Sequence, residues 1–563
     1  MAMKLRNRVK SVVAVVALAG CILLVAAAKD STFRLGQSVE VLVNMMRNIN
    51  LFYVDDIESD KIMKAAAEGM TKILDPYSVY LSPESMEEFD VMTTGKYGGL
   101  GSMIRQRGEW VEFSLPYEGS PADRAGIRPG DKILKIDGKD AKGMTSDQVS
   151  SKLKGDPGTT LTLEVGKFPT GEPQKVKITR EIISIPGVRY HGMVAEGVGY
   201  IDHNEFTVGC SNDLLRAYEE LVAEGMTSLI IDYRSNGGGV LQEAVKTLAL
   251  FLPAGSEVVS TRSSKSHAEN KTYKTESKPI AADIPLVVLT SGSSASAAEI
   301  VAGALQDHDR AVVVGQRTYG KGLVQSTFQL GYGAYAKLTT SKYYLPSGRC
   351  IQAIDYAAHN DDGSYNTIPD SLISEFKTRN GRRVYDGGGV MPDRKLEPEY
   401  VSSFAAVVYA QGFVDDFLNH FCALHYDRLE GNVAPETYHF TEADYEEFIE
   451  WMSDKEVLWE SYANTLWKEF KKAAEQQRWK ENMDEQIALI EKNLNNNSED
   501  NLRLYEREMR EIIENEIVRR YCYTAGGIVH YLKDDGELKE AISILSNPEE
   551  YARILSEQDT AKQ

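Results

Sequence analysis

Between about residues 175 and 397, short apolar segments alternate with stretches of helical periodicity, and this alternation constrains the fold more than any other feature. "SLIIDYRSNGGGVLQEAVKTLALFL" has the pattern of a strand, a glycine turn and a helix; "PLVVLTSGSSASAAEIVAGALQ" repeats it, and "AVVVG" is a third strand. Such β-α units are typical of a largely parallel sheet. Because functional groups gather where the strands of these sheets end, we expect the site there.

Length and charge limit the other possibilities. At 563 residues the chain is too long for one hydrophobic core, and we expect about three or four domains. Its 63 basic and 83 acidic residues give a formal net charge of −20. Binding to nucleic acid needs clustered Lys and Arg, so this balance argues against a nucleic-acid partner.

The first 28 residues have the pattern of an export signal. "MKLRNRVK" is basic, and "SVVAVVALAGCILLVAAA" is an apolar run that follows it. Cleavage after the alanines would release a soluble periplasmic protein, whereas retention would leave a short membrane anchor. The "LAGC" ending at Cys21 also resembles a lipoprotein cleavage box. We therefore expect residues 1–28 to be a signal peptide or membrane anchor, and the protein to reside in the periplasm or cell envelope.

The five cysteines are scattered and include no C-x-x-C pair, which argues against a zinc site or a disulfide scaffold. No metal or organic cofactor is implied. The five cysteines are Cys21, Cys210, Cys350, Cys422 and Cys522.

Helical periodicity dominates both ends of the chain. Residues 31–90 place apolar side chains at three- and four-residue spacing, and residues 401–563 do so again around an Asn-rich break. The first segment is too small to fold alone, so we expect it to pack on a neighbouring domain or a second subunit. Structural packing or dimerisation is the expected role of the second, and a homo-oligomer is the expected assembly.

Residues 92–170 alternate with period two and resemble a PDZ domain. The resemblance rests on the glycine-rich loop "YGGLGSMI" and on "GSPADRAGIRPGDKILKIDGK" some twenty residues later. In that family the loop amides bind the terminal carboxylate of a peptide that adds to the sheet edge. The resemblance implies that Gly98, Gly99, Leu100 and Gly101 bind the apolar C-terminal tails of protein substrates.

Lys321 lies in "AVVVGQRTYGKGLVQ", whose G-x-x-x-x-G-K pattern is most of the signature of a phosphate-binding loop. Such a loop needs Ser or Thr after the lysine and a helix that opens there. Here Gly322 follows, and "LVQSTFQL" alternates like a strand. The sequence therefore argues against a nucleotide site.

Ser296 follows the strand "PLVVLT" at the mouth of an Ala-rich helix, a position that suits a nucleophile beside an oxyanion site. Its neighbours Ser291, Ser293 and Ser294 are candidates for helix capping. The nearest histidine, His308, lies about three helical turns away and is too distant to act as base. A lysine can be the base when burial lowers its pKa and leaves it neutral.

The chain also resembles the carboxyl-terminal processing (tail-specific) serine proteases. The resemblance rests on "SASAAEIVAGALQDH", "GQRTYGKGLVQ", "DYRSNGGGVL", "KLTTSKYYLPSGRCIQ" and "GGGVMPD". In that family the nucleophilic serine precedes the lysine base by 25 positions, which selects Ser296 and Lys321. The resemblance further implies that Gln325 orients the lysine amine, and that the amides of Gly238 and Ala297 form the oxyanion hole.

The expected fold is therefore multidomain α/β, with a crotonase-like protease core over residues 175–400, a PDZ domain and terminal helical segments. The expected function is an exported serine endopeptidase that uses a Ser-Lys dyad on proteins recognised by their tails. The alternative is a non-catalytic PDZ scaffold with an inactive protease-like core. The chain departs from the family at Gly237, where Pro is frequent, and at Ala298, where a second Ser is frequent.

Overall fold

The computed structural model describes residues 33–265, 270–359, 365–398, 400–477, 479, 483–494 and 498–556. These residues form two compact units. One comprises the chain up to Met86 together with Gln325–Thr339, and the other comprises Glu87–Val324 and Thr340–Gln563. The predicted leader, including Cys21, lies outside the described residues.

The first unit combines helices with a strand that the helical periodicity did not predict. Residues 33–52 are helical, and α2 (Ser59–Thr71) precedes the short strand β1 (Val79–Leu81). β1 pairs antiparallel with part of β18 (Ala334–Tyr344), which follows β17 (Leu323–Gly331). A three-residue strand is too short to show a period of its own, and its partner lies more than 250 residues later.

The segment predicted to be a PDZ domain contains an antiparallel sheet with the order β3-β4-β5-β7-β8. Its core contains Val111, Phe113, Ile133 and Leu163, which are fully buried. β3 lies at the sheet edge, near α5. The elements are β3 (Ser102–Arg107), β4 (Trp110–Pro116), α4 (Pro121–Arg124), β5 (Lys132–Ile136), β6 (Lys139–Asp140), α5 (Ser146–Leu153), β7 (Thr160–Lys167) and β8 (Glu172–Thr179). A two-stranded sheet of β2 (Lys96–Gly99) and β9 (Glu181–Ser184) connects this domain to the rest of the unit.

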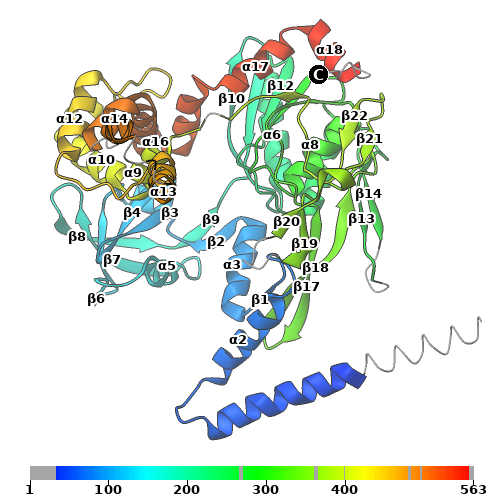
Figure 1. Cartoon of the computed structure of the whole chain (residues 1–563), viewed down its shortest axis with the longest axis horizontal. Helices are drawn as coiled ribbons and strands as arrows, with labels where there is room; N and C mark the ends of the chain where they lie inside the picture. Colours follow the sequence, from blue (N-terminus) through cyan, green and yellow to red (C-terminus); the bar gives the residue numbers. More distant parts are fainter. Residues whose placement is uncertain are drawn as a thin grey trace, which may run out of the picture. The chain divides into compact units, whose positions relative to one another are not determined.

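The predicted parallel sheet forms the centre of the second unit (Figure 1). Its order is β10-β11-β12-β15-β16-β23, and all neighbours are parallel except the edge strand β10. Every residue of β12, β15 and β16 is buried, as expected for strands covered on both faces. The strands are β10 (Val188–Ala195), β11 (Val198–His203), β12 (Ser228–Asp232), β15 (Leu286–Thr290), β16 (Val312–Gly315) and β23 (Arg394–Lys395).

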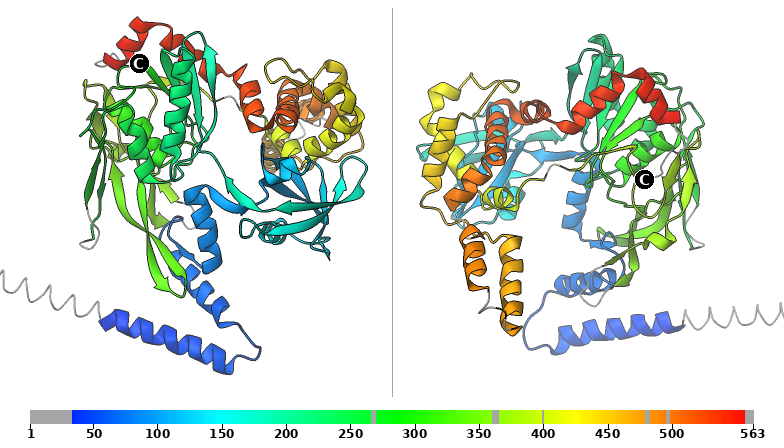
Figure 2. Two further views of the ribbon diagram at one scale, coloured as in Figure 1. Left: turned by 180° about the vertical axis from the view of Figure 1, so that it is seen from behind. Right: turned by 45° about the horizontal axis from the view of Figure 1, so that its top comes forward.

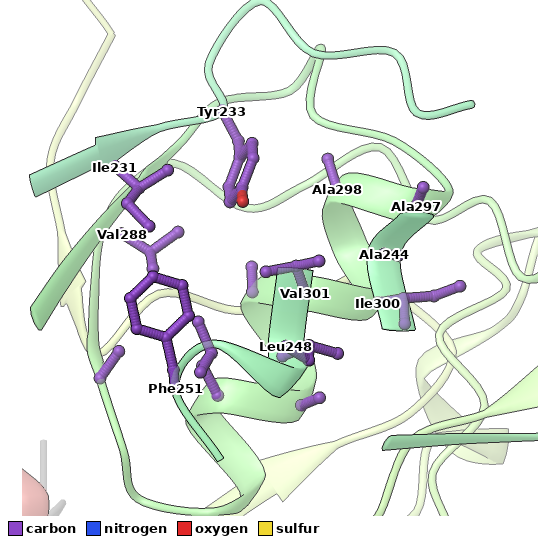
Figure 3. Close-up of a cluster of buried hydrophobic side chains, with 14 of the residues drawn as sticks. Ile231, Tyr233, Ala244, Leu248, Phe251, Val288, Ala297, Ala298, Ile300 and Val301 are labelled. Carbon is purple, nitrogen blue, oxygen red and sulfur yellow. The ribbon is translucent and has the colours of Figure 1, made fainter. Parts of the chain in front are cut away.

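Helices from distant parts of the chain cover the two faces of this sheet. One face packs against α6 (Cys210–Ala223), α7 (Leu241–Ala249) and α8 (Ala297–Asp307). Figure 3 shows part of that core, in which side chains of α7 and α8 lie with Ile231 and Val288 of the sheet. The other face packs against α17 (Gly536–Leu545) and α18 (Pro548–Ser556), drawn in red in Figure 2. The sheet of the predicted protease core is therefore covered on one face by helices from well beyond residue 400.

The remaining C-terminal helices form a separate apolar core that contains Phe417, Phe421, Phe448 and Ile513. Its longest helix, α16 (Glu506–Leu532), is interrupted at Tyr523, whose φ of 58° and ψ of −164° are not helical. None of the helices in the described part of the chain combines the length and the apolar character needed to cross a bilayer. The other helices are α9 (Ser403–Ala410), α10 (Phe413–Leu424), α11 (Tyr426–Leu429), α12 (Glu442–Met452), α13 (Tyr462–Gln476), α14 (Asp484–Leu494) and α15 (Ser498–Leu504).

Candidate active site

Three of the predicted site residues, Gly238, Ser296 and Lys321, lie on three loops at the carboxyl ends of neighbouring parallel strands. The glycine turn (residues 235–239) follows β12, the serine turn (residues 291–296) follows β15, and the lysine loop (residues 316–322) follows β16. β15 pairs with both β12 and β16, so the three loops leave the same edge of the sheet. This is the edge at which parallel sheets carry their functional groups.

Ser296 occupies the strained position between the serine turn and α8. Its φ of 56° and ψ of −114° lie outside the regions that L-residues normally adopt, and such strain is typical of functional sites. The hydroxyl of Ser291 donates to the Arg234 carbonyl at 2.5 Å, and that of Ser294 donates to the Tyr233 carbonyl at 2.8 Å. These two neighbours therefore fix the turn on the end of β12, and Ser296 remains the predicted nucleophile.

A buried carboxylate that the sequence analysis missed, that of Glu299, links the serine turn to the lysine loop. Its Oε2 accepts from the backbone N–H groups of Ser296 at 2.8 Å and Lys321 at 2.9 Å. The two nitrogens therefore lie no farther apart than the sum of these distances. Its Oε1 accepts from the Gly320 amide at 2.7 Å and the Thr318 hydroxyl at 2.5 Å. Burial raises the pKa of Glu299 to about 7, although these four donors favour the ionised form.

The sequence did contain a signal for Glu299. It is the third residue of α8, and Ser-x-x-Glu at a helix start is a capping-box pattern. It is also the sole charged residue between Ala297 and Gln306. Full burial of one carboxylate in an apolar helix needs several donors, and such donors mark a structured site.

Close packing also fixes the lysine loop on its other side. The Tyr343 hydroxyl donates to the Lys321 carbonyl and lies 3.3 Å from the Ser296 carbonyl, so Tyr343 and Glu299 each contact both residues. The Gly322 amide donates to Gln352 Oε1 at 2.8 Å. A Cβ at position 322 would lie 2.8 Å from the Gln352 backbone nitrogen, which explains the glycine. Lys321 itself is half-buried, and β17 starts at Leu323 without an intervening helix, unlike a phosphate loop.

The glycine turn brings Gly238 next to the candidate nucleophile. A Cβ at position 238 would lie 2.7 Å from Ser296 Cβ and 3.0 Å from the Ala297 nitrogen. Ala297 is the first residue of α8, where backbone N–H groups have no acceptor within the helix. The Gly238 N–H donates to Asn236 Oδ1 at 2.8 Å, so an oxyanion would have to replace this side chain as its acceptor.

Two neighbouring glycines of this turn give a matched test. We expect Gly238→Ala to lower the cleavage rate at least about 100-fold, because its φ of 103° and the contact with Ser296 both oppose a side chain. A Cβ at Gly237 meets nothing within 4 Å, and Gly237 has no positive φ. Gly237→Ala should therefore keep activity and raise the free energy of unfolding by about 0.4–1 kcal/mol. Steady-state kinetics and urea unfolding measure both effects, and equal losses in both variants would contradict the assignment.

Gln325 begins the segment that belongs to the first unit. There its Nε2 donates to the Thr339 hydroxyl at 3.1 Å, and that hydroxyl donates to Asp75 Oδ1 at 3.1 Å. Asp75 also accepts a hydrogen bond from the Ser78 hydroxyl. That hydroxyl in turn accepts from the Thr339 amide at 3.0 Å. Its role with Lys321 stays a prediction.

Two described histidines of the core, His308 and His203, have environments that do not suit a base for Ser296. His308 Nε2 lies 2.7 Å from the Glu257 carbonyl at the far end of α8, as its distance in sequence predicted. His203 is fully buried beside Phe206 and Tyr233, and burial lowers its pKa to about 4. No group of His, Cys, Asp and Glu in the described part of the chain is arranged to hold a metal ion.

The PDZ loop is folded so that its carbonyls are used within the domain. The carbonyls of Gly98, Leu100 and Gly101 accept from the amides of Gly155, Ala122 and Tyr117. A small cavity of about 70 Å³ lies beside the loop, between β3 and α5, and β3 is the sheet edge. A Cβ at Gly101 would lie 2.5 Å from Ser120, so this tight turn requires glycine. The cavity is lined by Tyr97, Gly99, Leu100, Gly101, Ser102, Ile104, Phe113, Ser150, Leu153 and Lys154.

Comparison with known protein families gives a match for the parallel-sheet core, for the PDZ segment and for the C-terminal helices. The family "Peptidase family S41" matches residues 197–359, "PDZ domain" matches residues 112–166, and "Probable PDZ-protease, C-terminal helical domain" matches residues 404–545. The chain is 35% identical over 317 residues to the "Carboxy-terminal-processing protease" of Bartonella bacilliformis, a match that covers 55% of this chain and 72% of that protein. It is 37% identical over 309 residues to the "Probable CtpA-like serine protease" of Staphylococcus aureus strain COL, covering 55% and 61%.

Among solved structures, the photosystem II D1 C-terminal processing protease is 26% identical, with a TM-score of 0.35 and coverage of 64% of this chain and 93% of that one. The similarity to the Bartonella relative extends over 72% of that protein at 35% identity, which shows the family. The chain belongs to the carboxy-terminal-processing proteases of peptidase family S41, and it is a serine-type protease with a PDZ domain.

Proposed function

We propose that this protease is an exported endopeptidase that uses Ser296 as nucleophile and Lys321 as general base on proteins recognised by their C-terminal tails. The observation that carries the proposal is the Glu299 carboxylate, which accepts from the backbone N–H groups of both residues and holds them together. The basic and apolar start of the chain supports export. Self-association through the helical segments is a further part of the proposal.

In the proposed reaction, neutral Lys321 removes the proton from the Ser296 hydroxyl as its oxygen attacks a peptide carbonyl. The amides of Gly238 and Ala297 stabilise the negative charge on the carbonyl oxygen. The leaving amine takes a proton from Lys321, and an acyl-enzyme on Ser296 remains. Water then releases the acyl group while Lys321 again acts as base. Gln325 is proposed to orient the lysine amine.

The PDZ domain is proposed to supply substrate selection. The tail would extend along the edge strand β3, with its terminal carboxylate at the loop amides of residues 98–101 and its last apolar side chain in the adjacent cavity. Because this loop recognises the carboxylate itself, a tail without the charge should bind poorly.

The test uses one tailed polypeptide in two forms, with a free C-terminal carboxylate and with a C-terminal amide. We expect the amide to raise KM at least about tenfold with little change in kcat, because it weakens binding and not the chemical step. Equal KM values for the two forms would contradict tail recognition by this loop.

A matched pair of PDZ variants localises the effect. Gly101→Ala should raise KM for the free tail, because its Cβ collides with Ser120. Gly108→Ala is the control, since Gly108 also has a positive φ but meets nothing within 4 Å of its Cβ. A similar KM change in both variants would point to general damage to the domain.

A further inference from the structure

A buried group of charges connects the C-terminal helix α17 to the loops of the active site. Arg234 directly precedes the glycine turn, and its guanidinium contacts Asp232 Oδ2 at 2.6 Å, Asp535 Oδ2 at 2.5 Å and Glu537 Oε2 at 2.8 Å. Burial alone would raise the pKa of Asp232, but the charge and hydrogen bonds of Arg234 hold it below its usual range. Burial raises the pKa of Glu537 above its ordinary value, although the charge and hydrogen bond of Arg234 oppose this rise.

Glu537 contacts the lysine loop with one oxygen and Arg234, the residue that precedes the glycine turn, with the other. Oε2 accepts from Arg234 Nη1, next to the glycine turn, and Oε1 accepts from the Nε2 of Gln316, the first residue of the lysine loop. The main chain of Arg234 reaches the third loop, because its carbonyl accepts from the Ser291 hydroxyl. One carboxylate of α17 thus holds the residues at which the glycine turn, with the proposed oxyanion donor, and the lysine loop, with the proposed base, begin.

The position of Glu537 is fixed by its helix and not by a flexible tail. Asp535 caps α17 by accepting from the amides of Glu537 at 2.9 Å and Leu538 at 3.0 Å. Leu538 belongs to the apolar core that α17 shares with the strands of the protease sheet. An ion pair held by such a rigid support loses little side-chain entropy, unlike a pair on the surface.

On one side, the starts of these loops border a cavity and not packed side chains. A cavity of about 750 Å³ borders Arg234, Ser235, Ser291 and Gln316. Buried ion pairs are often no more stabilising than apolar packing would be, so stability alone gives little reason to place one here. The contacts of Glu537 with Arg234 and Gln316 suggest another reason for the ion pair, which is to hold the starts of the two loops in place.

We propose that Glu537, with Arg234 and Gln316, positions the glycine turn and the lysine loop, so that the C-terminal helix α17 completes the catalytic centre. This inference rests on the proposed function, because it assigns the two loops to the oxyanion donor and the base. Glu537 touches no reacting atom and acts through Arg234 and Gln316.

The test compares two glutamates of the same helix. Glu537→Gln removes the charge that faces the two loops, whereas Glu540→Gln removes an ion pair between α17 and Arg394 of β23. We expect Glu537→Gln to lower kcat about tenfold to 100-fold with KM unchanged, since small displacements of catalytic groups have effects of this size. Glu540→Gln should keep kcat, and Glu537→Gln should have the lower Tm of the two variants because it removes a partner of the buried Arg234. Cleavage of the tailed polypeptide and thermal unfolding of the full chain give these quantities.

A double-mutant cycle with Gln316→Ala tests the route of the effect. Non-additive losses in kcat for Glu537→Gln and Gln316→Ala would show that the two residues act as a unit. Unchanged kcat in Glu537→Gln, or equal kcat losses in Glu537→Gln and Glu540→Gln, would overturn the inference. Ser296→Ala separates this failure from failure of the proposed function, because loss of labelling by a serine-directed probe in that variant depends on the nucleophile alone.

Discussion

Ser296→Ala and Lys321→Ala are each expected to lower cleavage of a tailed substrate by at least about 10⁴-fold, and the double variant should be no worse than either. Residues of a nucleophile-base pair act as a unit, so removal of one member removes most of what both supply. Single-turnover cleavage measures the loss, and a serine-directed probe should label the unaltered protein but not Ser296→Ala. Binding of the tail through the PDZ domain should persist in both variants.

Two controls make this prediction specific. Ser293→Ala removes an exposed hydroxyl of the same serine turn and should keep most of the activity. Lys321→Arg keeps a positive charge but cannot be deprotonated at working pH, so it should be as inactive as Lys321→Ala. Activity in Lys321→Arg would mean that the lysine serves only as a cation, and activity in Ser296→Ala would remove the nucleophile assignment.

Glu299→Gln is expected to lower kcat at least about 100-fold. The carboxylate accepts from three backbone N–H groups and one hydroxyl, and the amide of Gln would direct its own N–H groups at one pair of these donors. The turn that carries Ser296 and the loop that carries Lys321 would then separate. Glu243→Gln is the matched control: Glu243 is also buried, on the adjacent helix α7, but its partners are Ser211 and Lys246.

The pH dependence of Glu299 gives a second measurement of the same prediction. Its pKa of about 7 lies above the ordinary value of 4.5 because it is buried, so the folded protein binds its proton more tightly than the unfolded chain does. The stability that this residue contributes is therefore present below about pH 4.5 and is lost as the pH rises to about 7. Activity should change in the opposite direction, because the four donors need the ionised form.

Kinetics and urea unfolding over pH 5–9 would show the two trends, a range that brackets the pKa of about 7. Glu299→Gln should remove the Glu299 contribution to the stability change, whereas Glu243→Gln should leave it in place. A stability that rises between pH 5 and 7 through Glu299, or a rate that falls as the pH rises through 7, would contradict the role assigned to its carboxylate.

The parts of this molecule that could be predicted from the sequence are those with local signals. Apolar runs and glycine turns indicate the β-α units, and the alternation of apolar and polar residues indicates the PDZ strands. The family resemblance selects Ser296 and Lys321 as candidates, and the structure places their loops after adjacent strands. Glu299 had a capping-box signal three residues from Ser296, which was not used.

The contacts of α17 had no such signal. Arg234 and Glu537 are 303 positions apart, and helical periodicity in the C-terminal region indicates an apolar face without saying which surface it covers. The division of the C-terminal helices between their own core and the protease sheet likewise depends on packing between distant segments. Closeness in sequence was not a sufficient guide either. Gln325 is four residues after Lys321, but it belongs to the other compact unit.

The docking of α17 on the protease sheet has a consequence for how the enzyme comes into being. A ribosome makes the chain from its N-terminus, so the segments bearing Ser296 and Lys321 are synthesised well before Glu537. Under the positioning role proposed for Glu537, a nascent or prematurely terminated polypeptide would hold its nucleophile and base without the brace that aligns their loops. Proteolytic competence would then arrive only once the chain has been made as far as Glu537 and α17 has docked on the sheet.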